Sequence, residues 1–521
     1  THTHIHPLKI MSQTYRSSRS ASPETVSFET AIIQGLGKDG GLFIPSAIPQ
    51  VSQETMFSQW SKLSFQDLAF EIMKLYVNES EIPHADLKDL INKSYSTFRS
   101  EEVTPLNKNL IEGDNINILE LFHGPTYAFK DVALQFVGNL FEYFLNRGNG
   151  DLPKEQRKKI TVVGATSGDT GSAAIYGLRG KKDISVFILY PTGRISPIQE
   201  EQMTTVPDKN VQTLSVKGTF DNCQDIVKAI FADKEFNENH NVGAVNSINW
   251  ARILAQITYY FYSYFKISGS NPDIKIKFVV PSGNFGDILA GYFAKKMGLP
   301  VQKLVIATNE NDILDRFLKS GDYARSGDVK ATLSPAMDIL ISSNFERLLW
   351  YLARDQLANG DDIKAGEILS KWFSDLKSQG KFSVGPEVIK AALVDFDSER
   401  VSDPEILETI KQTYETSTSP KNYILDPHTA VGVKAVYNQK AKDSNSKDIQ
   451  YISLSTAHPA KFASAVDAAL RNYSAYSFEK DVLPADLKKL SALPKKIKLI
   501  ERADIELIKA TIDEELSKMD L

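Results

Sequence analysis

Residues 160–178 read "ITVVGATSGDTGSAAIYGL", and they run from an apolar strand through a glycine loop into a helix. Residues 274–300, "IKIKFVVPSGNFGDILAGYFAKKMGLP", repeat this order, and Gly298 and Pro300 supply the stop of the second helix. A further apolar run, "DISVFILYP", is typical of a strand that is buried on both faces. Such alternation predicts an α/β fold in which helices cover parallel sheets.

The rest of the chain divides around this pattern. Residues 11–102 predict a small, largely helical N-terminal region, since "SFETAIIQGL" and "SFQDLAFEIMKLYV" both open on serine and continue with helical spacing. We expect the α/β core at 103–480, with a polar, helix-rich insertion at about 309–423, and C-terminal helices at 481–521. Residues 1–10 precede Met11 and are interpreted as a cloning remnant or a translated leader.

Composition excludes several classes of protein. The 521 residues are 42% hydrophobic, enough for a large core, and the net charge of -5 argues against nucleic acid as a partner. No run approaches the roughly 18 apolar residues of a membrane span. Cys223 is the only cysteine, which excludes an internal disulfide and predicts a cytoplasmic protein. No metal site is expected, because the alternating histidines His2, His4 and His6 lie at a free terminus.

Lys130 stands out in "ELFHGPTYAFKDVALQF", residues 120–136. The apolar spacing of the residues that follow predicts a helix that begins near Lys130, where the macrodipole disfavours an ammonium group. Two interpretations are open. Asp131 and solvent accommodate an ordinary charged lysine, or the lysine is needed as a neutral amine.

Three loops are candidate binding elements. "GNFGD", residues 283–287, follows a strand and opens a helix, so its backbone N–H groups suit a single phosphate. "TSGDTG", residues 166–171, carries an acidic residue that would repel a polyphosphate, and it suits a carboxylate instead. Thr456 ends a predicted strand in "LSTAHPAKF", at the edge where α/β proteins bind ligands. Each loop also has an ordinary explanation when it is taken alone. "GNFGD" can be a common turn between strand and helix, "TSGDTG" a turn in which Thr170 or Asp169 only caps the helix, and Thr456 a cap or turn residue.

Together the motifs are more specific. In order, the chain contains "YRSSRS", "DGGLFIP", "HGPTYAFKD", "GATSGDTGSAA", "PSGNFGDILAGY", "DPHTAVG" and "STAHPAKF". Over nearly all of its length after Met11 the chain resembles the threonine synthase family, in its long fungal form. These are pyridoxal-phosphate enzymes of the tryptophan-synthase-β (type II) fold. The resemblance implies two parallel-sheet subdomains with helices on both faces.

The resemblance also implies roles for individual residues. Lys130 forms the Schiff base with pyridoxal 5'-phosphate, and Thr456 meets the pyridine nitrogen. The substrate carboxylate is received by "TSGDTG", through Ser167, Asp169 and Thr170. The cofactor phosphate is held by Gly283, Asn284, Phe285, Gly286 and Asp287. Asn249 and Arg252, in "NSINWARILAQ", are weaker candidates for the substrate's phosphate.

The implied reaction converts O-phospho-L-homoserine and water to L-threonine and phosphate, by γ-elimination of phosphate and β-addition of water. The base for the β proton is left open between Lys130 and the departing phosphate. Two alternatives also stay open: a β-replacement or dehydratase enzyme of the same fold, and a non-catalytic homologue that binds phosphorylated metabolites. The resemblance favours a monomer without nucleic-acid or membrane partners.

Overall fold

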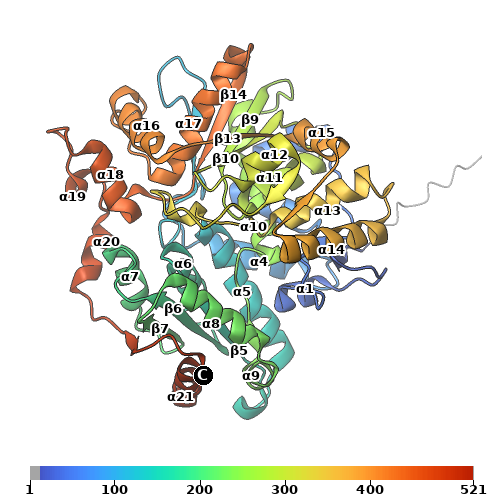
Figure 1. Cartoon of the computed structure of the whole chain (residues 1–521), viewed down its shortest axis with the longest axis vertical. Helices are drawn as coiled ribbons and strands as arrows, with labels where there is room; N and C mark the ends of the chain where they lie inside the picture. Colours follow the sequence, from blue (N-terminus) through green and yellow to red (C-terminus); the bar gives the residue numbers. More distant parts are fainter. Residues whose placement is uncertain (1–11, 520–521) are drawn as a thin grey trace, which may run out of the picture.

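Two mostly parallel sheets form the frame of the computed structural model, which describes residues 12–519 (Figure 1). All neighbouring strands within them are parallel except β3 and β4. The predicted α/β fold class is therefore confirmed. The larger sheet has the order β13 (Phe396–Arg400), β10 (Lys303–Thr308), β9 (Lys275–Pro281), β14 (Ile449–Ser455), β4 (Ile116–Glu120), β3 (Leu106–Asn107). The smaller has the order β15 (Lys498–Ile500), β7 (Val211–Val216), β6 (Ile184–Pro191), β5 (Ile160–Ala165), β8 (Val242–Gly243).

Helices cover both sheets and bury the central strands. All eight residues of β6 are buried, which explains its continuous apolar sequence. The core helices are α5 (Lys130–Asn149), α6 (Asp169–Leu178), α7 (Pro197–Thr204), α8 (Phe220–Ala232), α9 (Lys234–His240), α10 (Trp250–Ser268), α11 (Gly286–Met297), α17 (Pro427–Lys442) and α18 (Ala463–Leu470). Short 3-10 turns are η2 (Lys154–Gln156), η4 (Ser446–Asp448) and η5 (Pro459–Phe462). As predicted, α11 stops at Gly298, whose φ of 123° suits glycine.

The N-terminal region packs on α10 and is mainly helical, as predicted, with one small antiparallel sheet of β1 and β2. Both predicted serine caps are present, since Ser27 accepts from the N–H of Thr30 and Ser64 from that of Asp67. The elements are β1 (Tyr15–Ser17), α1 (Phe28–Gln34), β2 (Phe43–Pro45), α2 (Gln53–Ser58), η1 (Trp60–Lys62), α3 (Phe65–Met73) and α4 (His84–Tyr95). The expectation for residues 1–10 lies outside the described residues.

The segment at about 309–423 is helix-rich but is more than a helical insertion. Its strand β13 pairs with β10 and forms one edge of the larger sheet, and β11 pairs with β12. The predicted helix-rich character is present, and the short strands were not expected because they are defined by their pairing partners. The elements are α12 (Ile313–Ser320), β11 (Asp322–Ala324), η3 (Pro335–Met337), α13 (Phe345–Gln356), α14 (Asp362–Gln379), β12 (Lys381–Ser383), α15 (Pro386–Asp395) and α16 (Asp403–Thr416).

The C-terminal segment, for which helices were predicted, contains helices and one strand. It contains the strand β15, which pairs in parallel with β7 and completes the smaller sheet. The red end of the chain in Figure 1 runs along this sheet and finishes at α21. The helical pieces are α19 (Phe478–Asp481), α20 (Ala485–Lys488), η6 (Lys489–Ala492) and α21 (Ile505–Lys518). None of the helices within residues 12–519 has the length and apolar content to cross a membrane.

Candidate active site

Lys130 is the first residue of α5, so its predicted position at a helix start is confirmed. The loop before it is attached to the end of β14. The N–H of Phe129 donates to the carbonyl oxygen of Thr456 over 2.8 Å, and the N–H of His458 donates to that of Tyr127 over 3.0 Å. These bonds place Lys130 beside Thr456, far away in sequence, at the carboxyl edge of the larger sheet.

The amine of Lys130 has a hydroxyl for a partner. Its Nζ lies 2.9 Å from Oγ1 of Thr170, at the start of α6. Asp131 does not take up the charge, because its carboxylate accepts from the N–H (2.8 Å) and hydroxyl (2.7 Å) of Thr126. Burial, with help from Arg252 and Lys461 and against the pull of Asp169, lowers the pKa of Lys130 to about 8. The interpretation as a needed amine is therefore favoured.

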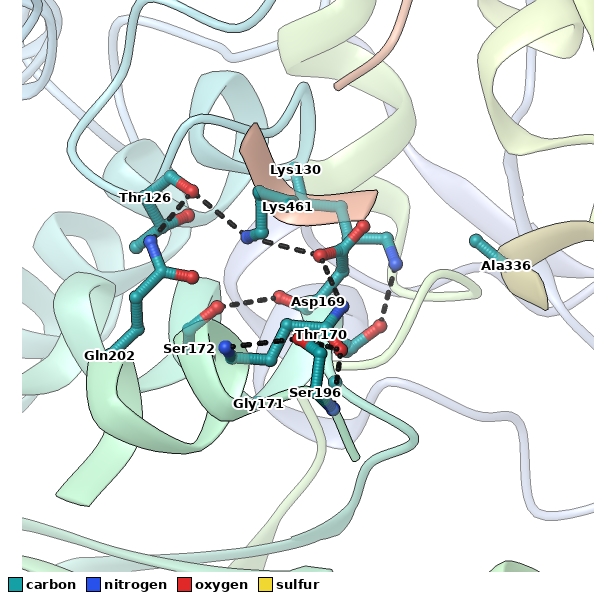
Figure 2. A network of polar contacts seen from close by, with 12 residues as sticks. Thr126, Lys130, Asp169, Thr170, Gly171, Ser172, Ser196, Gln202, Ala336 and Lys461 are labelled. Atoms are coloured by element: carbon teal, nitrogen blue, oxygen red, sulfur yellow. Dashed lines mark hydrogen bonds and ion pairs between the residues drawn. The ribbon is translucent and has the colours of Figure 1, made fainter. Parts of the chain in front are cut away.

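The "TSGDTG" loop is closed by its own first residue. The Thr166 hydroxyl accepts from the N–H groups of Gly168 and Gly171, both over 2.9 Å, so Thr166 supplies the cap that we assigned to Asp169 or Thr170 as the alternative. The Ser167 side chain is exposed. Asp169 is buried and accepts from Lys461 over 3.0 Å and from Gln199 over 3.1 Å (Figure 2). Of the three predicted carboxylate-binding side chains, Thr170 is the one in contact with Lys130.

The "GNFGD" loop leads from β9 into α11. Phe285 adopts a left-handed conformation with φ of 71°. No side chain among residues 12–519 caps α11, so the first N–H groups of the helix have no side-chain partner there. The segment at about 309–423 holds the backbone of this loop by hydrogen bonds. The carbonyl oxygen of Asn284 accepts from the N–H of Asn344 (2.9 Å), and that of Gly283 from the hydroxyl of Ser342 (2.6 Å).

Asp287 lies in the first turn of α11 but its side chain faces the core. Its Oδ1 accepts from the hydroxyls of Tyr259 and Tyr260, the latter over 2.9 Å, and its Oδ2 is buried without a partner in the described part of the chain. Burial raises the pKa of this carboxyl to about 7, although both tyrosine hydrogen bonds oppose the shift. In this position Asp287 offers a ligand only its backbone N–H.

Asn249 and Arg252, which the sequence left as equal candidates, have different environments. Asn249 caps α10 by accepting from the N–H of Ala251 (3.1 Å), and its amide donates to the carbonyl oxygen of Ile32 (2.9 Å). Arg252 is buried, and the one hydrogen bond of its guanidinium within residues 12–519 is a 3.3 Å contact to the carbonyl oxygen of Val245. Burial lowers the pKa of Arg252 to about 10, and its Nε has no hydrogen-bond partner among the residues that the structure describes.

This donor set fits a phosphate-bearing aldehyde. A buried guanidinium without a carboxylate partner calls for an anion, and the uncapped start of α11 offers N–H groups to a phosphate. Lys130 supplies an amine whose pKa of about 8 leaves about half of it unprotonated at that pH. The Thr456 hydroxyl forms no hydrogen bond with any part of the chain between residues 12 and 519, and so it is available to a ring nitrogen.

Sequence reasoning missed the polar contacts that hold the site together. Lys461 was quoted within "STAHPAKF" but not singled out, and Thr126, Gln199 and Gln202 were not considered. Both Lys461 and Gln202 donate to the Thr126 carbonyl oxygen, over 2.9 and 3.1 Å. The available signal was a lysine between prolines, alanines and aromatic residues, a setting in which a charged side chain needs a partner.

Comparisons with known proteins agree with this site. Family models match residues 14–95 as "Threonine synthase N terminus", residues 99–372 as "Pyridoxal-phosphate dependent enzyme" and residues 429–512 as "Threonine synthase, C-terminal". The chain is 75% identical to the threonine synthase of Saccharomyces cerevisiae over 98% of this chain and 99% of that one.

Solved structures give the same result. The crystal structure of threonine synthase from yeast superimposes with a TM-score of 0.95 at 75% identity, covering 97% of this chain and 99% of that one. The pyridoxal-phosphate-bound threonine synthase from Brucella melitensis gives a TM-score of 0.85 at 39% identity, covering 97% and 99%. The chain belongs to the threonine synthase family of pyridoxal-phosphate-dependent enzymes.

Proposed function

We propose that Lys130 binds pyridoxal phosphate covalently and serves as the proton-transfer group of this threonine synthase. The reaction converts O-phospho-L-homoserine and water to L-threonine and phosphate. The observation that carries the proposal is the Lys130 amine at the start of α5. It is hydrogen-bonded to a neutral hydroxyl and has a pKa lowered to about 8, so the free base is accessible near neutral pH.

Besides Lys130, residues of two elements would hold the cofactor. The loop of Gly283, Asn284, Phe285 and Gly286, with the N–H of Asp287, would bind the phosphate through the backbone at the start of α11. Thr456 would hold the ring nitrogen with its hydroxyl. A hydroxyl secures a protonated ring less firmly than a carboxylate, so this contact moderates the electron demand of the ring.

Lys130 carries the proton steps. Bound pyridoxal phosphate supplies an electron sink for the negative charge that develops at the substrate Cα. Once the substrate amine has taken its place, the free Lys130 amine removes the proton at Cα and later returns one there. Thr170 orients that amine through its hydroxyl. In balance, Cγ loses phosphate and gains hydrogen, while Cβ loses hydrogen and gains the hydroxyl of water.

Charged groups of the substrate need separate contacts. We assign the substrate's phosphate to Arg252, because its buried guanidinium has no carboxylate partner among residues 12–519. Ser167 and Thr170 are assigned to the substrate's carboxylate. Asn249 and Asp169 are not assigned to the substrate directly but hold the site in place. The side chain of Asn249 is engaged in capping α10, and that of Asp169 is paired with Lys461.

Replacement of Lys130 by alanine tests the assignment. The variant should fold, because it removes a partly buried amine from a helix start. It should still bind pyridoxal phosphate, but borohydride treatment should not attach the cofactor covalently to the protein. Single-turnover phosphate release should fall at least about 1,000-fold, because nucleophile and base are lost together.

Two controls sharpen this test. Lys130→Arg should be equally inactive, because a guanidinium cannot become neutral at working pH. Wild-type enzyme should release phosphate and threonine from phosphohomoserine, without pyruvate or ketoacid from serine or threonine. Near-wild-type phosphate release by Lys130→Ala would exclude Lys130 from both roles.

We also propose that the enzyme acts as a cytoplasmic monomer on this small molecule, with neither nucleic acid nor membrane as partner. One chain supplies every residue assigned above, and the lone cysteine is buried. Sedimentation at assay concentration tests the oligomeric state, and a dimer would contradict it.

A further inference from the structure

Lys461 brings a second lysine next to the first. It lies in η5, just after β14, and its side chain is 0% exposed. Its Nζ is 3.0 Å from Oδ1 of Asp169 and donates to the carbonyl oxygen of Thr126 over 2.9 Å. Figure 2 shows the amine of Lys461 beside the Asp169 carboxylate and the amine of Lys130 beside the Thr170 hydroxyl.

Asp169 is a fixed negative charge within this group. Burial alone would raise its pKa, but Lys461, Lys130 and His428 outweigh burial and hold the pKa of Asp169 well below its usual range. Gln199 adds a hydrogen bond of 3.1 Å to the same oxygen. An ionised carboxylate therefore stands beside the catalytic amine throughout the working pH range.

Asp169 pairs with Lys461 and not with Lys130, and this choice is not explained by stability. A buried ion pair contributes little to stability, because desolvation of both charges offsets their attraction. Both Lys461 and Lys130 act electrostatically on Asp169, yet the ion pair of Asp169 is with Lys461. Lys130 turns to the neutral hydroxyl of Thr170 and forms no ion pair with any residue between 12 and 519.

We propose that Lys461 is a positioning residue that occupies the Asp169 carboxylate and so keeps the Lys130 amine free to act as a base. The proposal rests on the role assigned to Lys130 above. Without Lys461, Asp169 would be left buried and uncompensated, and Lys130 would be the nearest cation able to pair with it. The pair would hold Lys130 as ammonium.

The charges around Lys130 give the direction of the effect. Asp169 on α6 favours the protonated amine, whereas Arg252 on α10 and Lys461 on η5 disfavour it. His428 on α17 also lowers the pKa of Asp169. Loss of Lys461 removes a positive charge that disfavours the protonated amine of Lys130. It also leaves the Asp169 carboxylate, which favours that protonated amine, without its ion-pair partner. Both changes raise the pKa of Lys130.

Lys461→Met tests this, because methionine keeps much of the length and removes the charge. Below the pKa of its base, kcat falls tenfold per pH unit, so we expect the acidic limb of the kcat profile to move up by about 1–2 pH units. The absorbance of the bound cofactor, which depends on protonation at the nitrogen of Lys130, should titrate in the same direction in the holoenzyme.

Three further variants separate charge from structure. Lys461→Arg should stay within about 0.5 unit of wild type, because it keeps the charge. Asp169→Asn should move the limb to lower pH by about 1 unit, because the favouring charge is lost. Lys461→Met combined with Asp169→Asn should return the limb towards wild type. If Lys461→Met does not fold, the Asp169→Asn profile decides.

An unmoved limb in Lys461→Met or in Asp169→Asn overturns the proposal. So does a double variant that keeps the full upward shift, because the effect would then not pass through Asp169. Failure of the proposed function is a different result: Lys130→Ala would remain active. If Lys130→Ala is inactive and the limb is unmoved, the proton-transfer role stands and the positioning role of Lys461 falls.

Discussion

At the scale of single residues, burial acts on two basic side chains with different results. The pKa of Lys130 falls to about 8, so the amine can lose its proton near neutral pH. The pKa of Arg252 falls to about 10, so the guanidinium stays charged near neutral pH. One environment thus yields a base and a permanent cation within the same site.

The contrast between Arg252 and Asn249 gives a residue-scale prediction. Arg252→Lys should raise KM for phosphohomoserine about tenfold or more, because lysine cannot reproduce a bidentate phosphate contact. Asn249→Ala should leave KM near wild type and lower stability by about 1–2 kcal/mol, because it removes the cap of α10. Steady-state kinetics and thermal melting of both variants measure the two effects.

A third measurement completes this comparison. Cofactor affinity, titrated by absorbance, should be similar in wild type and Arg252→Lys if the arginine binds the substrate's phosphate. A large loss of cofactor affinity with an unchanged KM would move Arg252 to the cofactor phosphate. The opposite pattern of KM in the two variants would reverse the roles of Asn249 and Arg252.

Part of the site could be predicted at this scale. Lys130 was identifiable because a lysine at a helix start lacks a local reason to be there. Asn249 and Arg252 could not be ranked, because capping and ligand binding favour the same residue types at a helix start. Lys461 escaped notice because its partners Asp169 and Thr126 are distant in sequence, and only the assembled fold brings them together.

At the scale of elements, α5 and α6 meet at a backbone contact that aligns Lys130 with Thr170. A Cβ on Gly138 would lie 1.9 Å from the carbonyl oxygen of Gly177, and a Cβ on Gly177 would lie 2.6 Å from that of Leu134. The two helices cross as closely as they do because neither glycine has a side chain. Both helices begin at the site, so their crossing sets the distance between the amine and its hydroxyl.

Gly138→Ala should therefore lower the enzyme activity although Gly138 lies outside the site. Overpacking costs about 1–3 kcal/mol or more and should separate the helices, lowering both melting temperature and kcat. Gly148→Ala is the matched control in the same helix, because nothing lies within 4 Å of the added Cβ. It should stabilise the protein by about 0.5–1 kcal/mol and leave kcat unchanged. Equal effects of the two substitutions would contradict the role of the crossing.

The predictability of elements followed their length and periodicity. The strand–loop–helix units at β5–α6 and β9–α11 were evident from sequence, because long apolar runs and glycine loops mark them locally. The strands β13 and β15 were not, because five and three residues give no clear period and become strands only by pairing with β10 and β7.

At the scale of the whole molecule, the end of the chain seals the smaller sheet. The strand β15 covers the edge of β7, and Ile508 and Ile512 of α21 pack in one cluster with Cys223 of α8. Burial raises the pKa of the Cys223 thiol to about 11, which keeps it inert. The only cysteine of the sequence is thus a reporter for the attachment of this segment.

Deletion of residues 495–521 should expose that reporter. The loss of buried isoleucines amounts to several kcal/mol, at about 1.5–3 kcal/mol for each side chain, and uncovers the edge of β7. A thiol reagent should modify Cys223 at least about tenfold faster than in the full chain, with the denatured full chain as the upper limit. An unchanged rate would show that the segment does not protect α8.

The position of β14 has a consequence for synthesis of the protein. This strand lies between β9 and β4 in the larger sheet, yet it follows β9 by more than 160 residues along the chain. While the ribosome is translating the intervening segment, the sheet lacks its middle strand and exists as two unjoined halves with open edges. The loop before Lys130 is also hydrogen-bonded to the segment at the end of β14. The nascent chain therefore has no complete cofactor-binding site until translation is nearly finished. Loading with pyridoxal phosphate is therefore among the last events in the making of this enzyme, and free cofactor meets an almost full-length chain.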